Sequence, residues 1–243
     1  MAPPRPASRS RTQRHRLSAP FMVLLFLALA TSSTVANAQL SDSYYDASCP
    51  AALLTIRTVV SAAVLLDPRM GASLLRLHFH DCFVQAIKLS LLGGPSWTVL
   101  LGRRDSTTAS ASLANSDLPA PSSTLATLLA AFSNKGLTTT DMVVLSGTVH
   151  SGDGSGLAPL DESSPDAFDN GYFGGLLSQR GLLHSDQALF AGGGGSTDGL
   201  VRSYASSNDQ FASDFSTAMV KMGNISPLTG SAGEIRVNCR AVN

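Results

Sequence analysis

Apolar side chains recur at helical spacing along most of this 243-residue chain. In residues 44–66 one helical face is formed by Ile56, Val59, Val60, Ala63 and Val64. The same kind of spacing predicts further helices over 69–83, 125–132, 142–145, 167–177 and 211–222. Among the remaining segments, Trp97–Leu101 alone has the composition of a strand, and it is short. The pattern therefore predicts a mainly α protein.

Small polar residues precede two of these predicted helices. Ser122 and Ser123 lie just before the helix at 125–132, where a hydroxyl can accept a hydrogen bond from an unpaired backbone N–H. Thr140 and Asp141 occupy the same place before the next helix. We therefore expect these four residues to cap the two helices.

Residues 1–38 have the organisation of an export signal. Five arginines and His15 precede the apolar run Phe21–Ala30, and Ala36-Asn37-Ala38 has the small-x-small pattern of a cleavage site. The apolar run is shorter than the about 20 residues that a membrane-spanning helix needs, although a retained signal anchor is the alternative. We expect a signal peptide over 1–38, a mature chain from about Gln39, and secretion with no membrane partner afterwards.

Charge disfavours a nucleic-acid partner. The 17 basic residues balance 17 acidic ones, but five of the arginines lie in the predicted signal. Removal of that segment leaves 12 basic against 17 acidic residues, a net charge of −5. A non-specific nucleic-acid binder needs a basic surface, so we expect no such partner.

The densest group of reactive side chains is the run Arg76-Leu77-His78-Phe79-His80-Asp81-Cys82. Arg76 and His80 are four residues apart, so on a helix both side chains project from one face. This pair suits peroxide cleavage, because a neutral imidazole can move a proton between the two oxygens while a guanidinium stabilises the developing negative charge. Spacing alone more often reflects a different arrangement, in which the histidine is a hydrogen-bonded core residue and the arginine pairs with a carboxylate.

Motifs on both sides of this run resemble those of the secreted plant haem peroxidases (class III), in the family's order and over most of the mature chain. Ala72–Gln85 is similar to the distal haem helix of that family at nearly every position, and Tyr44–Pro50 to its start. The other matching motifs are Gly93–Trp97, Leu101–Ser106, Asp141–Val143, Leu145–Gly147, Phe168–Asn170, Gly181–Gln187, Met222–Gly230 and Gly233–Arg240.

The resemblance implies a mainly α, two-domain haem-peroxidase fold that holds haem b and two calcium ions. The implied activity removes hydrogen peroxide by oxidising phenolic and similar small donors, so these molecules are the expected partners. The family also implies a monomer that is secreted to the extracellular region or cell wall and takes part in the response to oxidative stress.

Carried over by position, the resemblance assigns the peroxide chemistry to two residues, His80 as the acid–base group and Arg76 as the stabiliser of charge. Pro119 matches the position that lines the donor channel. Asp186 matches the carboxylate that holds the haem-ligating histidine, and such a partner fixes the tautomer of the imidazole and strengthens it as a ligand.

The calcium ligands that the resemblance assigns are oxygen donors, as this ion requires. Asp81 and the carbonyl of Val84 begin the distal site. The proximal site takes Ser151, Asp161, Ser164, the carbonyl of Ala167, and Asp169.

Two blocks of the family pattern are absent from this chain. After Gln85 the family continues with a Gly-Cys-Asp-Ala-Ser segment and several helices, whereas here residues 86–89 lead almost directly to Gly93. That block carries most distal calcium ligands and the asparagine that keeps the distal histidine basic. We therefore expect an incomplete distal calcium site.

The second gap lies between residues 147 and 157, beside the family's haem-ligating histidine. The ligand is expected at position 149, which is Val149, and His150 follows one residue later. One residue is about 100° of rotation on a helix. His150 can still serve as the axial ligand if the glycine-rich run 152–156 lets the backbone adjust, and the alternative is that His150 is incidental.

Three cysteines remain, Cys49, Cys82 and Cys239, so at least one has no partner within the chain. The resemblance implies four disulfides in the family and places the partners of these three cysteines in the first missing block.

Two functions are therefore open. The first is a haem peroxidase with His80 and Arg76 on the distal side and His150, supported by Asp186, on the proximal side. The alternative is a catalytically impaired, secreted peroxidase-like protein without productive haem binding. For both we expect a haem peroxidase region over 39–243, truncated by internal deletions near 85–88 and 147–157.

Overall fold

The structure is a computed structural model, which describes residues 40–67, 70, 94–108, 112, 116–147, 164, 167–238 and 241–243. The chain divides into two compact units, Met1–Asn37 and Ala38–Asn243, of which the first lies outside the described residues. The predicted signal, the predicted helix at 69–83 apart from Met70, and the glycine-rich run at 152–156 also lie outside them.

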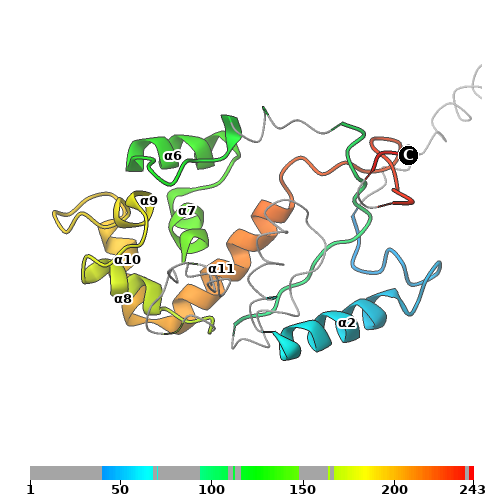
Figure 1. Ribbon diagram of the computed structural model, residues 1–243, viewed down its shortest axis with the longest axis horizontal. Coiled ribbons are helices and arrows are strands. Elements are labelled where there is room, and N and C mark those ends of the chain that lie inside the picture. Colours follow the sequence, from blue (N-terminus) through cyan, green and yellow to red (C-terminus); the bar gives the residue numbers. More distant parts are fainter. Residues whose placement is uncertain are drawn as a thin grey trace, which may run out of the picture. The chain divides into compact units, whose positions relative to one another are not determined.

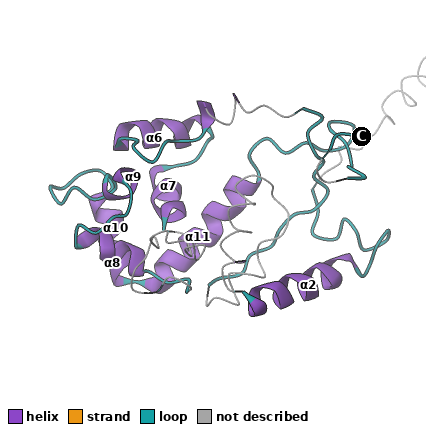
Figure 2. Cartoon of the chain, viewed as in Figure 1, coloured by secondary structure: helices purple, strands orange, loops and turns teal. Residues whose placement is uncertain are grey.

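Helices form the regular structure of the described residues (Figure 1). They are α2 (Ala52–Leu66), α6 (Leu125–Asn134), α7 (Thr139–Ser146), α8 (Gly171–Leu177), α9 (His184–Gln187), α10 (Asp198–Ser206) and α11 (Asn208–Gly223). Figure 2 shows most of the rest of this part of the chain as loops. The prediction of a mainly α fold is confirmed. Within these same residues, no helix is both long and apolar enough to cross a membrane.

Thr124 caps α6 in place of the two predicted serines. Its hydroxyl accepts a hydrogen bond from the backbone N–H of Thr127 at 3.3 Å, and the helix begins at Leu125. Ser122 and Ser123 instead belong to the preceding turn. Sequence spacing alone did not distinguish three consecutive hydroxyl residues, because each can act as a cap.

The start of α7 lies three residues upstream of its predicted position. The Thr138 hydroxyl accepts from the N–H of Asp141 at 3.2 Å, while the Asp141 carboxylate accepts from the N–H of Thr138 at 2.8 Å. This reciprocal pair is a capping box. The prediction that Thr140 caps the helix was wrong, whereas Asp141 does take part in the cap.

Side-chain hydrogen bonds also set the starts of α8 and α11. The Asp169 carboxylate accepts a hydrogen bond from the N–H of Gly171 at 2.9 Å and forms a turn there. The helix α8 therefore begins at Gly171, whereas the sequence predicts a start at residue 167. Ser207 caps α11 by accepting from Gln210 at 3.2 Å, so that helix begins three residues earlier than predicted. The periodicity analysis missed α9 and α10, which have four and nine residues.

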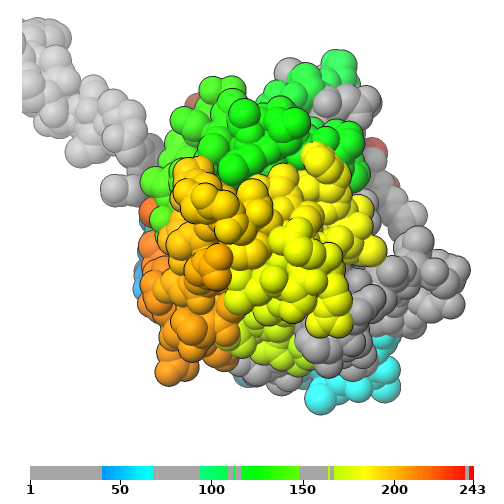
Figure 3. All heavy atoms as spheres, turned by 90° about the vertical axis from the view of Figure 1, so that its left-hand side faces the viewer, coloured from blue at the N-terminus to red at the C-terminus, as the bar shows by residue number. Residues whose placement is uncertain are grey.

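An aromatic cluster forms the core between α8, α10 and α11. The ring of Phe173 lies 5.2 Å from that of Tyr204 and 5.1 Å from that of Phe211, between centroids, and Phe168 stacks on Phe211 at 4.8 Å. Figure 3 shows the segments that supply these rings side by side on one face. Gly147, which ends α7, approaches so closely that a Cβ would lie 2.6 Å from the Phe173 ring.

The helix α2 confirms the C-terminal part of the stretch predicted to be helical from residue 44, since residues 42–48 form turns. Val60 and Val64 on one face are buried, whereas Leu65 and Leu66 at the end of the helix are exposed.

The predicted strand Trp97–Leu101 is an extended segment that pairs at one residue rather than forming a ladder. Leu101 exchanges two backbone hydrogen bonds with Ser41, at 2.8 and 3.0 Å. A second isolated bridge joins Asp105 to Glu234 by two bonds of 2.9 Å. No further strand pairing occurs in the described residues, so the strand prediction was wrong.

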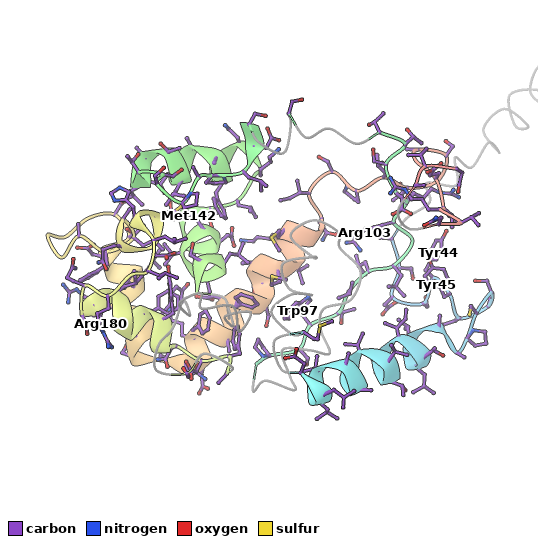
Figure 4. The ribbon with its side chains drawn as sticks, in the orientation of Figure 1. Tyr44, Tyr45, Trp97, Arg103, Met142 and Arg180 are labelled. Atoms are coloured by element: carbon purple, nitrogen blue, oxygen red, sulfur yellow. The ribbon has the colours of Figure 1, made fainter. Side chains whose placement is uncertain are left out.

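Arg103, between these two bridges, ties the same segment to the end of α11. Its guanidinium donates to the carbonyl of Gly223 through Nε at 3.1 Å and Nη2 at 2.8 Å, and to the side-chain oxygen of Asn224 at 3.2 Å. Figure 4 places the Arg103 side chain beside the C-terminal end of the helix, and Trp97 of the same segment lies 6.0 Å from the Phe215 ring of α11. Because a C-terminal turn leaves carbonyls without helical partners, this arginine compensates the end of α11.

Candidate functional site

The described residues include five of the predicted site residues: Pro119, Ser164, Ala167, Asp169 and Asp186. The predicted distal pair, the candidate axial ligand and the remaining calcium ligands lie outside them, at Arg76, His80, Asp81, Val84, His150, Ser151 and Asp161. The described residues therefore belong mainly to the predicted proximal side of the site, around Asp186 and Asp169.

Asp186 is a buried carboxylate in α9, with 7% of its surface exposed. Its Oδ2 accepts a hydrogen bond from the backbone N–H of Leu183 at 2.8 Å. Its Oδ1 accepts a hydrogen bond from the hydroxyl of Tyr172 at 3.2 Å. A buried charge requires such partners, and these two donors, one on each oxygen, hold the plane of the carboxylate in one orientation.

Tyr172 comes from α8 and is itself 4% exposed. Burial, together with the negative charge of Asp186 and the hydrogen bond to it, raises the pKa of Tyr172 well above its ordinary value. The hydroxyl therefore keeps its proton and acts as the donor. Sequence reasoning missed this residue. The signal that could have found it is a tyrosine on the buried face of a predicted helix, where its hydroxyl must find a partner.

Gln187, the next residue after Asp186, fixes the loop that joins α8 to α9. Its side-chain nitrogen donates to the carbonyls of Phe190 at 2.9 Å and Leu176 at 3.2 Å, and its oxygen accepts from the N–H of Gly181 at 2.9 Å. The side chains of Asp186 and Gln187 thus both join α9 to α8 or to the loop between them. These hydrogen bonds fix the position of the Asp186 carboxylate.

The segment of the predicted donor-site residue lies against the same short helix. The N–H of Ser185 in α9 donates to the carbonyl of Pro121 at 3.0 Å. Pro119, two residues earlier, is half-buried. The structure therefore brings the segment that contains Pro119 next to the helix that contains Asp186.

The predicted calcium ligands Ser164 and Asp169 are in direct contact. The hydroxyl of Ser164 donates to Asp169 Oδ1 at 2.9 Å, and the N–H of Ala167 donates to the carbonyl of Ser164 at 3.2 Å. Across the described ranges, no three His, Cys, Asp or Glu side chains gather. What gathers here is a mixed set of hydroxyl and carboxylate oxygens, the donor chemistry that suits calcium.

Asp198, another buried carboxylate, has a structural environment. Its two oxygens accept from the backbone N–H groups of Ala191 at 3.1 Å and Gly194 at 2.8 Å. Burial alone would raise the pKa of Asp198, but these donors, with that of Gly195 and the charge of Arg202, lower it. Its backbone donors all lie in the loop before α10, so we assign this residue to loop closure.

Comparisons with known proteins agree on one family. The family model described as "Peroxidase" matches residues 85–207. "Peroxidase 22.3" of Oryza sativa subsp. japonica is 46% identical over 309 aligned positions, which cover 90% of this chain and 96% of the relative. "Peroxidase 70" of Zea mays is 45% identical, with 91% and 97% covered, and "Peroxidase 1" of Hordeum vulgare is 42% identical, with 89% and 97% covered. The 309 aligned positions exceed the 243 residues of this chain by 66, so the alignment with the rice relative has gaps on this chain's side.

Proposed function

This chain belongs to the peroxidase family of plants and is a hydrogen-peroxide-dependent oxidoreductase. On that basis we propose that it is a secreted haem peroxidase that oxidises phenolic and similar small donors. The observation that supports this most directly is the buried Asp186 carboxylate, held by two donors at the position where the family resemblance requires the partner of the haem ligand.

On the distal side we assign proton transfer to His80 and charge stabilisation to Arg76. A neutral imidazole takes a proton from one peroxide oxygen and returns that proton to the leaving oxygen. The guanidinium four residues earlier stabilises the negative charge that develops as the bond breaks. The support for these roles is the i, i+4 spacing within a family motif.

On the proximal side we assign the axial ligand to His150 and its partner to Asp186. Haem, when bound, supplies the iron that takes up the oxidising equivalents of the peroxide. The described residues fit this group, because a carboxylate that is 7% exposed and held in one plane can accept the ring N–H of a histidine. Asp186 would then fix the imidazole's tautomer and orientation and strengthen the other ring nitrogen as a ligand.

For calcium we assign a proximal site to Ser151, Asp161, Ser164, Ala167 and Asp169, and the remainder of a distal site to Asp81 and Val84. The 2.9 Å contact between the Ser164 and Asp169 oxygens supports the proximal site, since two ligands of one ion lie about this far apart. A bound calcium ion would hold together the residues that precede α8.

We place donor binding at Pro119 and secretion with residues 1–38. The hydrogen bond from Ser185 to Pro121 supports a donor site close to α9. The basic, apolar and small-residue regions of 1–38 support removal of this segment as a signal peptide, which leaves a secreted monomer from about Gln39.

The second candidate function is that of a catalytically impaired peroxidase-like protein. What favours it is length, because the 309 aligned positions exceed this chain by 66 residues. Because 90% of this chain is aligned, about 219 of its residues share the 309 positions, which leaves about 90 gap positions on its side. Such gaps are consistent with the deletions that we propose near 85–88 and 147–157.

The visible absorption spectrum of the secreted mature chain, after addition of haem and calcium, distinguishes the two functions. We expect a sharp Soret band that shifts when hydrogen peroxide is added. The variant His150→Ala should lose or alter this band, whereas His184→Ala, which changes an exposed histidine of α9, should retain it. A broad spectrum of free haem in the wild-type chain would overturn the peroxidase proposal in favour of the impaired protein.

A further inference from the structure

Tyr172 stands out among the residues that the proposed mechanism leaves unused. Its buried hydroxyl donates a hydrogen bond to Asp186 Oδ1 at 3.2 Å, and the backbone N–H of Leu183 donates to Oδ2 at 2.8 Å. The tyrosine comes from α8 and the carboxylate from α9, so the hydrogen bond joins two separate elements. It is not needed to start α9, because the bond from Leu183 already does that.

We propose that Tyr172 is a positioning residue for the proximal ligand, which sets through its hydrogen bond to Asp186 how strongly that carboxylate accepts from the axial histidine. This inference rests on the proposed function and extends it to a residue to which the resemblance gives no role.

The physical basis is the distribution of charge on the carboxylate. A hydrogen bond to a carboxylate stabilises its charged form and lowers its basicity. Asp186 with the Tyr172 bond is therefore a weaker acceptor than Asp186 without it. A weaker acceptor withdraws less of the ring proton from the histidine, which makes the other ring nitrogen a poorer donor to iron. Because a poorer donor stabilises ferric iron less, the Tyr172 hydroxyl should favour the ferrous state.

The environment of Tyr172 leaves its hydroxyl little freedom to move elsewhere. The side chain is 4% exposed, and its ring meets that of Phe173 edge to face at 5.2 Å. The raised pKa keeps the hydroxyl protonated. The donor is therefore permanent, unlike a surface hydroxyl that exchanges partners with water.

The chain offers a matched control in Tyr204. The ring of this tyrosine is also buried, and its hydroxyl donates to the Asp214 carboxylate at 2.9 Å in a hydrogen bond that is only partly buried. It lies in α10 and its acceptor in α11. Removal of the hydroxyl from either tyrosine deletes the same atom and the same kind of hydrogen bond, but only Tyr172 bonds to Asp186.

The experiment is a spectroscopic redox titration of the haem-loaded, secreted mature chain, in which the ferrous-to-ferric ratio is measured at fixed applied potential. Tyr172→Phe should lower this ratio several-fold relative to wild type, and Tyr204→Phe should leave it unchanged. Urea unfolding of the same proteins should show similar losses of stability. In an Asp186→Asn background, Tyr172→Phe should no longer shift the ratio.

Each other result has a distinct meaning. Equal shifts in the two tyrosine variants, or no shift in either, would overturn the role of Tyr172 while the wild-type haem spectrum preserved the proposed function. A Tyr172→Phe chain that bound no haem, while Tyr204→Phe did, would show that the tyrosine builds the site rather than tunes it and would also overturn the inference. A wild-type chain without bound haem would refute the proposed function and this inference with it.

Discussion

The ammonium group of Lys221 in α11 lies 2.9 and 3.0 Å from the two carboxylate oxygens of Asp141 in α7. Asp141 is 2% exposed, and Oδ2 also accepts from the hydroxyl of Thr138 at 2.7 Å. One carboxylate thus starts a helix by closing its capping box and joins that helix to the longest helix described. Loss of its charge should weaken both the start of α7 and the contact between α7 and α11.

Replacement of Asp141 by asparagine should lower the free energy of unfolding by about 1.5–3 kcal/mol, the range expected for hydrogen bonds to a charged group. The variant keeps the shape of the side chain and one oxygen for the capping box, but it loses the negative charge and one of the two oxygens that contact Lys221. Urea unfolding of the wild-type and variant chains measures the difference.

The exposed pair of Lys135 and Asp117 provides the matched control, because both side chains are 44% exposed. Solvent screening leaves such a pair with little net stabilisation, so Asp117→Asn should unfold close to the wild-type midpoint. Equal losses in the Asp117 and Asp141 variants would contradict the structural role given to Asp141.

Acid should weaken the contact between Asp141 and Lys221. Burial alone would raise the pKa of Asp141, but the hydrogen bonds from Thr138 and the charge of Lys221 outweigh it and lower the pKa below the ordinary value of 3.8. The unfolded chain therefore takes up this proton at higher pH than the folded chain. This contribution to stability is complete above the ordinary pKa and is lost as pH falls through the lowered value. Between about pH 6 and about pH 2, stability should fall less steeply in Asp141→Asn than in wild type.

A methyl group at Gly147 should be destabilising. The added Cβ would lie 2.6 Å from the Phe173 ring and 3.3 Å from that of Phe211, in the aromatic cluster. Overpacking of this kind costs about 1–3 kcal/mol. Gly175→Ala is the control, since a Cβ there meets nothing within 4 Å and alanine favours the helix by up to about 1 kcal/mol. Thermal unfolding should show opposite shifts for the two variants; a stabilising Gly147→Ala would exclude the close approach.

The distal assignment predicts a separation of activity from haem binding. His80→Ala should lower the turnover of a phenolic donor by about 10²–10⁴-fold, the range of general acid–base catalysis, and leave the Soret band in place. His78→Ala is the control, because residues two apart on a helix point in different directions. Steady-state assays with hydrogen peroxide measure both. Retained turnover in His80→Ala would require another acid–base group.

Removal of calcium should lower the stability of the chain. A ligand present at 100 times its dissociation constant stabilises the folded state by about 2.7 kcal/mol, so chelation should remove about that much. Asp169→Asn should remove most of the response, because it deprives the proposed site of the carboxylate that Ser164 contacts. Asp42→Asn, at an exposed loop position, should keep it. An unchanged response in Asp169→Asn would place the calcium elsewhere.

The fold class could be predicted from sequence because long helices bury apolar faces at a regular period. The spacing that indicated α11 agrees with the buried positions of Phe211, Phe215 and Met219. It failed for α9, whose four residues are too few to show a period. It also failed at Trp97–Leu101, where a strand-like composition belongs to a segment held by one bridge and by Arg103.

Sequence singled out Asp186, which the structure shows as a buried acceptor and whose role toward a haem ligand stays a prediction, but sequence did not single out the donor Tyr172. Asp186 lies in a family motif. Tyr172 is fourteen residues away in the chain, and only the contact between α8 and α9 brings its hydroxyl to Asp186. Helix starts were similarly ambiguous, since Ser122, Ser123 and Thr124 all carry a suitable hydroxyl and only the backbone conformation chooses among them.

The segment around Arg103 has a consequence for the order of events during synthesis. Its partners are Ser41 on one side and Gly223 and Glu234 on the other, the last two being 120 and 129 residues further along than Arg103 and Asp105. A chain that emerges from its N-terminus can assemble α7, α8 and α10 from neighbouring residues. Ser41 is available early, but Arg103 and Asp105 must wait until Gly223 and Glu234 have been made. We therefore expect this part of the segment to be ordered late, so an interrupted synthesis would leave it exposed to proteases.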